Sequence, residues 1–371
     1  MPVFNCNNTE WVSGEGTLFL GQQPGLHDTI NTRFPEISKL ALRQVSQRWV
    51  FDEFNHEQSR LDLLNCPESV YKVMLMNLAY QWHADSVASR AIAPLFAPFV
   101  TNSELWEALL ENTNMEITHA KTYSEIVRQC VADPSEVFKM VMENEKTIAR
   151  SSTVNKVFDG LAVIGALRTL KENGVNQFAV GEQTQYNTAF MAVVALYCLE
   201  RIQFMASFAA TFAIVEQGYF QSIGKAVQKI MLDEIAVHAA LDAEVLKVEL
   251  STERGLIARK ECGKLIHMML QEVVDQELQW SEYLFSEGRA IVGLNPALLK
   301  DWVRYNAQPV FDALGYDLDW DRITVNPLPW MLSWINIDKT QNANQEADGN
   351  NYALNVVKND IGINEVFDFE L

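Results

Sequence analysis

Two pairs of acidic and imidazole side chains have the spacing expected of ligands to a metal ion. Glu116 and His119 are three residues apart in a predicted helix, so at about 100° per residue their side chains point about 60° apart on one face. Glu234 and His238 are four residues apart, which also places both groups on one face. Such pairs are common on solvent-exposed helices, so neither pair predicts a site by itself.

Two further predicted helices each place a single carboxylate in apolar surroundings, namely Asp85 and Glu200. Together with the two pairs they give four carboxylates and two imidazoles from four helices, the ligand pattern of dinuclear metal sites in helical bundles. Four negative charges offset two divalent cations, and oxygen and imidazole donors suit iron or manganese. Without metal the buried carboxylates would repel one another and take up protons, so we expect metal binding to release protons and to stabilise the fold.

Tyr123 is expected to lie close to this site. It follows Glu116 by seven residues, about two helical turns, and points within about 20° of the same direction. Phe204 and Phe208 follow Glu200 by one and two turns, so they can surround the phenol ring with apolar groups. Such packing would protect an oxidised tyrosine from water and reductants, whereas the alternative is an ordinary buried tyrosine with a polar partner.

The elements that position these residues are predicted to be almost entirely helical. Proline is favoured in the first turn of a helix, and Pro67 opens a long apolar run, while Thr101 or Ser103 can cap the next helix. The predicted helices cover residues 67–97, 103–131, 134–150, 152–172, 186–217, 220–249, 253–288 and 295–314. The best strand signal is a short hairpin at 177–180. The sequence therefore predicts an all-α bundle.

The chain divides into one large helical domain over residues 1–337 and a flexible C-terminal tail over 338–371. The tail is rich in Asn, Asp, Gln and Glu, ends in FDFEL, and lacks a helical apolar stripe long enough to pack.

The composition and charge of the chain argue against nucleic acid and membranes as partners and favour a cytoplasmic location. The formal net charge of -19 argues against binding to nucleic acid or to an anionic membrane. The apolar run 188–215 carries Glu200 and Arg201 in its middle, which favours a buried bundle helix over a membrane span. Five scattered cysteines and a polar N-terminus indicate free thiols in a reducing cytoplasm.

From Gln47 onward the chain resembles the small, radical-generating subunit of class I ribonucleotide reductase. The likeness rests on EITHAKTY at 116–123, on Asp85 as the first ligand, on Glu200 followed by SFAATF, and on the pair Asp233-Glu234. It implies a ferritin-like bundle that holds two metal ions, iron in the first place, with manganese or a mixed Mn/Fe pair as alternatives. It also implies a tyrosyl radical on Tyr123, whose oxidising equivalent passes reversibly to a large subunit that reduces ribonucleotides.

The resemblance also implies a transfer route and two protein partners. Trp49 stands where the family has its relay tryptophan, and Asp233 would join it to His119. Tyr352 stands where a tail tyrosine is expected, and the tip FDFEL resembles the peptide that docks with the large subunit. The family pairs through its long helices, so a homodimer is expected.

The chain departs from the family pattern at the last ligand helix. The family has His three residues after the last Glu, but here Val237 holds that place and His238 follows it. One extra residue turns a side chain about 100° around a regular helix, and such an insertion is commonly absorbed in one π-helical turn. We therefore expect a π-bulge between Glu234 and His238. Leu232 replaces the Arg typical before Asp233, so local hydrogen bonding is expected to differ.

Two other functions fit the same ligands. A di-metal oxygenase or desaturase would need a substrate pocket beside the metals and would gain nothing from Trp49 or the tail. An iron-storage ferritin would normally be a much shorter chain without a tail peptide. The ligand set leaves the choice between iron and manganese open, since both favour similar donors.

Overall fold

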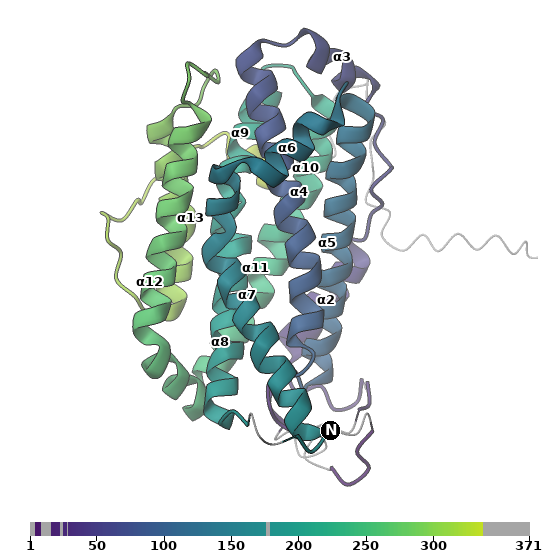
Figure 1. The fold of residues 1–371 in the computed structure, drawn as a ribbon, viewed down its shortest axis with the longest axis vertical. Coiled ribbons are helices and arrows are strands. Elements are labelled where there is room, and N and C mark those ends of the chain that lie inside the picture. Colours follow the sequence, from purple (N-terminus) through teal and green to yellow (C-terminus); the bar gives the residue numbers. More distant parts are fainter. Residues whose placement is uncertain (1–3, 9–15, 23–24, 28, 176–178, 337–371) are drawn as a thin grey trace, which may run out of the picture.

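The fold is that of a helical bundle, seen in a computed structural model that describes residues 4–8, 16–22, 25–27, 29–175 and 179–336. Its α-helices are α2 (Pro35–Ser46), α3 (Glu57–Asn65), α4 (Glu68–Phe96), α5 (Ser103–Cys130), α6 (Pro134–Glu143), α7 (Glu145–Glu172), α8 (Glu182–Cys198), α9 (Met205–Val215), α10 (Gln221–Asp233), α11 (Ala239–Leu250), α12 (Glu253–Leu284), α13 (Pro296–Leu314) and α14 (Met331–Ile335). Two π-helical turns, η1 (Leu199–Gln203) and η2 (Glu234–His238), interrupt the series. The long helices run side by side along the long axis of the molecule (Figure 1).

The predicted all-α class is confirmed. Among the described residues the extended pairings are two isolated bridges, Phe19 with Val100 and Ile291 with Leu294. Part of the hairpin predicted at 177–180 lies outside the described residues, and 179–180 form no strand. The tail 338–371, with Tyr352 and the tip FDFEL, also lies outside them.

Capping side chains explain where several helices begin, and they correct two expectations. Asn102, rather than Thr101 or Ser103, caps α5, because its side chain accepts a hydrogen bond from the Leu105 backbone N–H at 2.8 Å. The predicted break near residue 151 is wrong. Asn144 caps α7 by accepting from the backbone N–H groups of two residues in the first turn, so one helix runs from 145 to 172.

The apolar run that carries Glu200 lies in the centre of the bundle. By length and composition alone, Glu182–Val215 could cross a membrane, but 89% of its most apolar window is buried inside the protein. It packs against α7, α11 and α12, and η1 divides it at Glu200. This agrees with the expected buried bundle helix.

Four helical segments bring the predicted ligands to one level of the bundle. α4 packs along α5, η1 packs against η2, and α10 also contacts α5. The connection between α2 and α3, which carries Trp49, packs beside α5 and α10. These contacts place side chains far apart in sequence around a common interior.

Candidate metal centre

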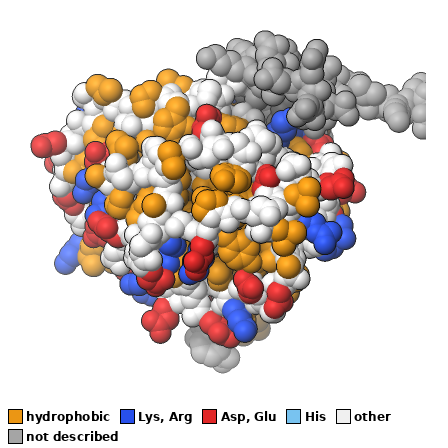
Figure 2. Space-filling model, turned by 90° about the horizontal axis from the view of Figure 1, so that it is seen from above, with side chains coloured by type: hydrophobic (Ala, Val, Ile, Leu, Met, Phe, Trp, Pro, Cys, Tyr) orange, Lys and Arg blue, Asp and Glu red, His pale blue; other side chains and the backbone are white. Residues whose placement is uncertain are grey.

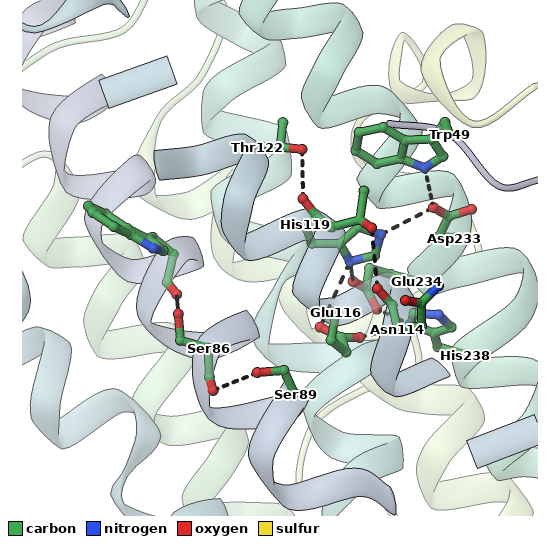
Figure 3. A network of polar contacts seen from close by, with 12 residues as sticks. Trp49, Ser86, Ser89, Asn114, Glu116, His119, Thr122, Asp233, Glu234 and His238 are labelled. Carbon is green, nitrogen blue, oxygen red and sulfur yellow. Dashed lines mark hydrogen bonds and ion pairs between the residues drawn. The ribbon is translucent and has the colours of Figure 1, made fainter. Parts of the chain in front are cut away.

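The six predicted ligand side chains meet in the core, each fully buried. Asp85 comes from α4, Glu116 and His119 from α5, Glu200 from η1, and Glu234 and His238 from the two ends of η2. Figure 3 shows Glu116, His119, Glu234 and His238 converging on one another. Water is excluded from all six groups, so their charges interact strongly.

The expected π-bulge is confirmed and directs His238 into the cluster. Within η2 the wider turn absorbs the extra residue, so the two end residues share a face. His238 Nδ1 lies 3.0 Å from Glu234 Oε2 and 3.0 Å from Glu116 Oε1. A π-turn disturbs the backbone hydrogen-bond ladder, and here Arg43 of α2 donates to the Ala236 carbonyl at 3.2 Å.

The second π-turn, η1, was not predicted from the sequence. It carries Glu200, and its last carbonyl, that of Gln203, accepts a hydrogen bond from the buried Arg150 guanidinium. Arg150 is held in turn by a buried ion pair with Glu277 and by Ser207. The carboxylate of Glu200 is therefore presented by a turn whose backbone is fixed from a neighbouring helix.

The donor atoms form two overlapping sets. One contains Glu116, Glu200, Glu234 and His238, and the other contains Asp85, Glu116 and His119, with the donor atoms of each set within 4.8 Å of one another. Glu116 belongs to both sets, and His119 Nδ1 also lies 3.0 Å from Glu234 Oε1. Two adjacent cations bridged by carboxylate would match this arrangement.

The electrostatics of the cluster show why a cation fits. Burial, followed by the charge of Glu116, raises the pKa of Asp85 well above its usual value, and both Asp85 oxygens lack a hydrogen-bond partner among the described residues. Burial, followed by Glu234, raises the pKa of Glu200 likewise. Burial alone would lower the pKa of His238, but the carboxylates of Glu234 and Glu116 outweigh it and raise that pKa to about 10. Divalent cations would replace protons as the positive charge here.

Tyr123 is fully buried, and its hydroxyl has no hydrogen-bond partner in the described part of the chain. Burial, followed by the charges of Asp85, Glu234 and Glu116, raises its pKa well above the usual value, so the phenol lies within electrostatic reach of the cluster. The expected inward direction of Tyr123 is confirmed.

Trp49, Asp233 and His119 form a continuous chain of contacts into the cluster (Figure 3). The Trp49 indole N–H donates to Asp233 Oδ2 at 2.7 Å, and the same oxygen lies 3.1 Å from His119 Nε2. The Trp49 and His119 rings are stacked, with centroids 5.8 Å apart and planes inclined by 23°. Because Nε2 of His119 faces Asp233, its Nδ1 is left to face the carboxylates.

Sequence reasoning missed three side chains at the edge of the centre. Asp242, one turn after His238 on α11, is buried. Burial raises its pKa well above the usual value, and the charge of His238, which lowers that pKa, is opposed by the charge of Glu234. Lys229, one turn before Asp233 on α10, lies over the Trp49 ring. Arg43, described above, comes from a helix that was not predicted. The i,i+4 spacings of the first two offered a signal, but such spacings also occur widely on surfaces.

Comparison with known proteins gives a consistent result. The sequence model of the family described as "Ribonucleotide reductase, small chain" matches residues 27–327. The chain is 28% identical to the ribonucleoside-diphosphate reductase subunit beta of Haemophilus influenzae, over 95% of this chain and 96% of that protein. It is 26% identical, with the same coverages, to the ribonucleoside-diphosphate reductase 1 subunit beta of Escherichia coli O157:H7.

Solved structures share the fold. The ribonucleotide reductase R2 subunit from Clostridium botulinum superposes with a TM-score of 0.75 at 20% identity, covering 90% of this chain and 98% of that one. The dimanganese(II)-NrdF of Streptococcus sanguinis superposes with a TM-score of 0.66 at 14% identity, covering 84% of this chain and all of the other.

Proposed function

The chain belongs to the family of the small chain of ribonucleotide reductase, and from this premise we propose which residues perform the work of such a subunit. It is a ferritin-like helical bundle and a small subunit of ribonucleoside-diphosphate reductase with a dinuclear metal site. We propose that the ligands are Asp85, Glu116, His119, Glu200, Glu234 and His238, and that Tyr123 carries the radical.

The observation that carries the assignment is the pair of overlapping donor sets that share Glu116. A carboxylate common to both sets can bridge two cations, and the four acidic ligands neutralise their charge in a site closed to water. When bound, the metal ions supply the one-electron oxidation of the tyrosine by an oxygen-derived oxidant. Iron is the first choice, and manganese or a mixed pair would suit the same donors.

The chain's own residues protect and carry the oxidising equivalent. The phenol of Tyr123 has no hydrogen-bond partner among the described residues and lies in the apolar interior, so contact with water and reductants is prevented. The contacts from His119 through Asp233 to Trp49 form the start of a route toward the surface. Asp233 accepts the indole N–H bond and fixes the orientation of both rings.

The rest of the route involves the tail. We propose that residues 1–337 form the metal-binding domain, and that 338–371, outside the described residues, docks with the large subunit through FDFEL. Tyr352 would carry the oxidising equivalent across that interface. The large subunit would then use a cysteine to reduce ribonucleotides to deoxyribonucleotides.

A second copy of the chain is the other proposed partner. Leu42 and Val45 on α2 and Leu110 and Ile117 on α5 are each at least 40% exposed, and the two helices pack together. Apolar side chains left exposed on packed long helices suit a homodimer interface. On the face seen in Figure 2, Lys and Arg side chains are interspersed with Asp and Glu. We place the protein in the cytoplasm.

The test is electron paramagnetic resonance after reconstitution with ferrous iron and oxygen. The wild-type chain is expected to show a tyrosyl radical signal that Tyr123→Phe loses while retaining its metal. Tyr80→Phe, which alters another fully buried tyrosine, serves as the matched control and keeps the signal. A signal that persists in Tyr123→Phe would place the radical elsewhere.

A further inference from the structure

The connection between α2 and α3 is fastened to α10 by Lys229. The Lys229 ammonium, with 14% of its side chain exposed, forms an ion pair with Glu53. It lies over the Trp49 ring, 5.6 Å from the centroid, and over the Phe54 ring at 5.3 Å. Burial lowers the pKa of Lys229 to about 8, against the opposing effect of the Asp233 carboxylate.

Lys229 lies close to Asp233, which is buried beside the candidate metal centre. Asp233 Oδ2 accepts the indole N–H bond of Trp49 at 2.7 Å and lies 3.1 Å from His119 Nε2. The residue before it, Leu232, is apolar and 5% exposed. Lys229, one helical turn earlier on the same helix, brings an ammonium group to the same region.

We propose that Lys229 is a positioning residue that holds the Trp49 indole against Asp233 through its ion pair with Glu53 and its place over the ring. This inference rests on the proposed function of Trp49 and Asp233 as a transfer route. The ammonium contacts the faces of Trp49 and Phe54, whose rings pack edge to face with centroids 6.1 Å apart. One side chain therefore fixes the indole through its ring and through its aromatic neighbour.

Loss of Lys229 is expected to loosen Trp49 without unfolding the connection. A second anchor remains, because the buried His56 Nδ1 lies 2.9 Å from Ser222 Oγ and Ser59 Oγ lies 2.7 Å from the same atom. The change removes the ion pair with Glu53 and the place of the ammonium over the Trp49 and Phe54 rings. A single hydrogen bond is worth up to about a tenfold change in an equilibrium constant, so loosening the indole from Asp233 has a measurable effect on Trp49.

The experiment compares Lys229→Met, Lys229→Arg and a matched control, Lys225→Met, one turn earlier on α10. Hydrogen exchange of the Trp49 indole N–H is measured by NMR on the full-length chain before metal is added, with the resonance assigned by its absence in Trp49→Phe. Lys229→Met is expected to speed exchange several-fold, up to about tenfold, and to reduce turnover with the large subunit by a similar factor. The radical yield stays unchanged, because the metal ligands are untouched. Lys229→Arg and Lys225→Met stay within about twofold of wild type.

Several results would overturn the inference. Exchange or turnover in Lys229→Met equal to that of Lys225→Met would do so, as would equal losses in Lys229→Arg and Lys229→Met. Should Lys229→Met not fold, Glu53→Gln removes the same ion pair from the other side, and an unchanged exchange rate there contradicts the proposal. Full turnover in Trp49→Phe would refute the transfer route itself. Full turnover in Lys229→Met beside a loss in Trp49→Phe would refute only the role of Lys229.

Discussion

Replacing Asp85 by Asn is expected to stabilise the metal-free protein while weakening its metal binding. Asp85 is fully buried, both of its oxygens lack a hydrogen-bond partner among the described residues, and Glu116 lies close enough to repel its charge. Folding therefore forces this carboxyl to take up a proton. An amide of the same shape needs no proton, so the variant avoids that cost.

The magnitude follows from the raised pKa of Asp85. A carboxyl that stays neutral in the folded chain costs about 1.4 kcal/mol for each pH unit above its unfolded pKa of about 3.9. The cost is at most about 4 kcal/mol at pH 7 and at most about 1.5 kcal/mol at pH 5. Because the pKa is raised on folding, this penalty is absent below the unfolded pKa and grows as pH rises toward the folded pKa.

The assay is urea denaturation of the metal-free chain in the presence of a chelator, at pH 5 and pH 7. The free energy of unfolding of Asp85→Asn minus that of wild type is expected to increase by up to about 3 kcal/mol between the two pH values. The burial cost of the amide is the same at both pH values and cancels from this change. Asp275→Asn, on the exposed side of α12, is the control and shows no such change. A difference for Asp85→Asn that does not vary with pH would refute the reasoning.

Three further outcomes are expected. Binding of Mn²⁺ or Fe²⁺ to the metal-free chain releases protons, because burial raises the pKa values of Asp85 and Glu200. Calorimetry in buffers of different ionisation enthalpy measures the number of protons released, and a release of zero would contradict the expectation. Deletion of 351–371 abolishes reductase activity with the large subunit and leaves metal binding intact, so surviving activity would disprove docking through the tail. Sedimentation gives a dimer that Ile117→Lys weakens and Val163→Lys, at an exposed position on α7, does not; a wild-type monomer would disprove the interface.

Much of the site could be predicted from the sequence, because the spacing of ligands along a helix and the periodicity of its apolar residues are local properties. The apolar runs around Asp85 and Glu200 indicated buried helices, and the extra residue before His238 indicated a π-turn, which the structure contains. The start of α7 was missed because the cap at Asn144 depends on one side chain competing with its neighbours for backbone N–H groups.

Features that depend on tertiary contacts were not predictable. The π-turn at Glu200 is fixed by Arg150, which donates to the Gln203 carbonyl from another helix. The placement of Lys229 over Trp49 depends on how the connection between α2 and α3 packs on α10. The contact of Arg150 with η1 and that of Lys229 with Trp49 each join separate segments of the chain, so no residue spacing within one helix indicates them.

The most direct test of the central claim is a crystal structure of the full-length protein grown with Mn²⁺, in which anomalous scattering locates the metal. The account predicts two adjacent ions per chain, bridged by Glu116 and bound also by Asp85, His119, Glu200, Glu234 and His238. A single ion, ions elsewhere, or His238 turned away from the metals would contradict it.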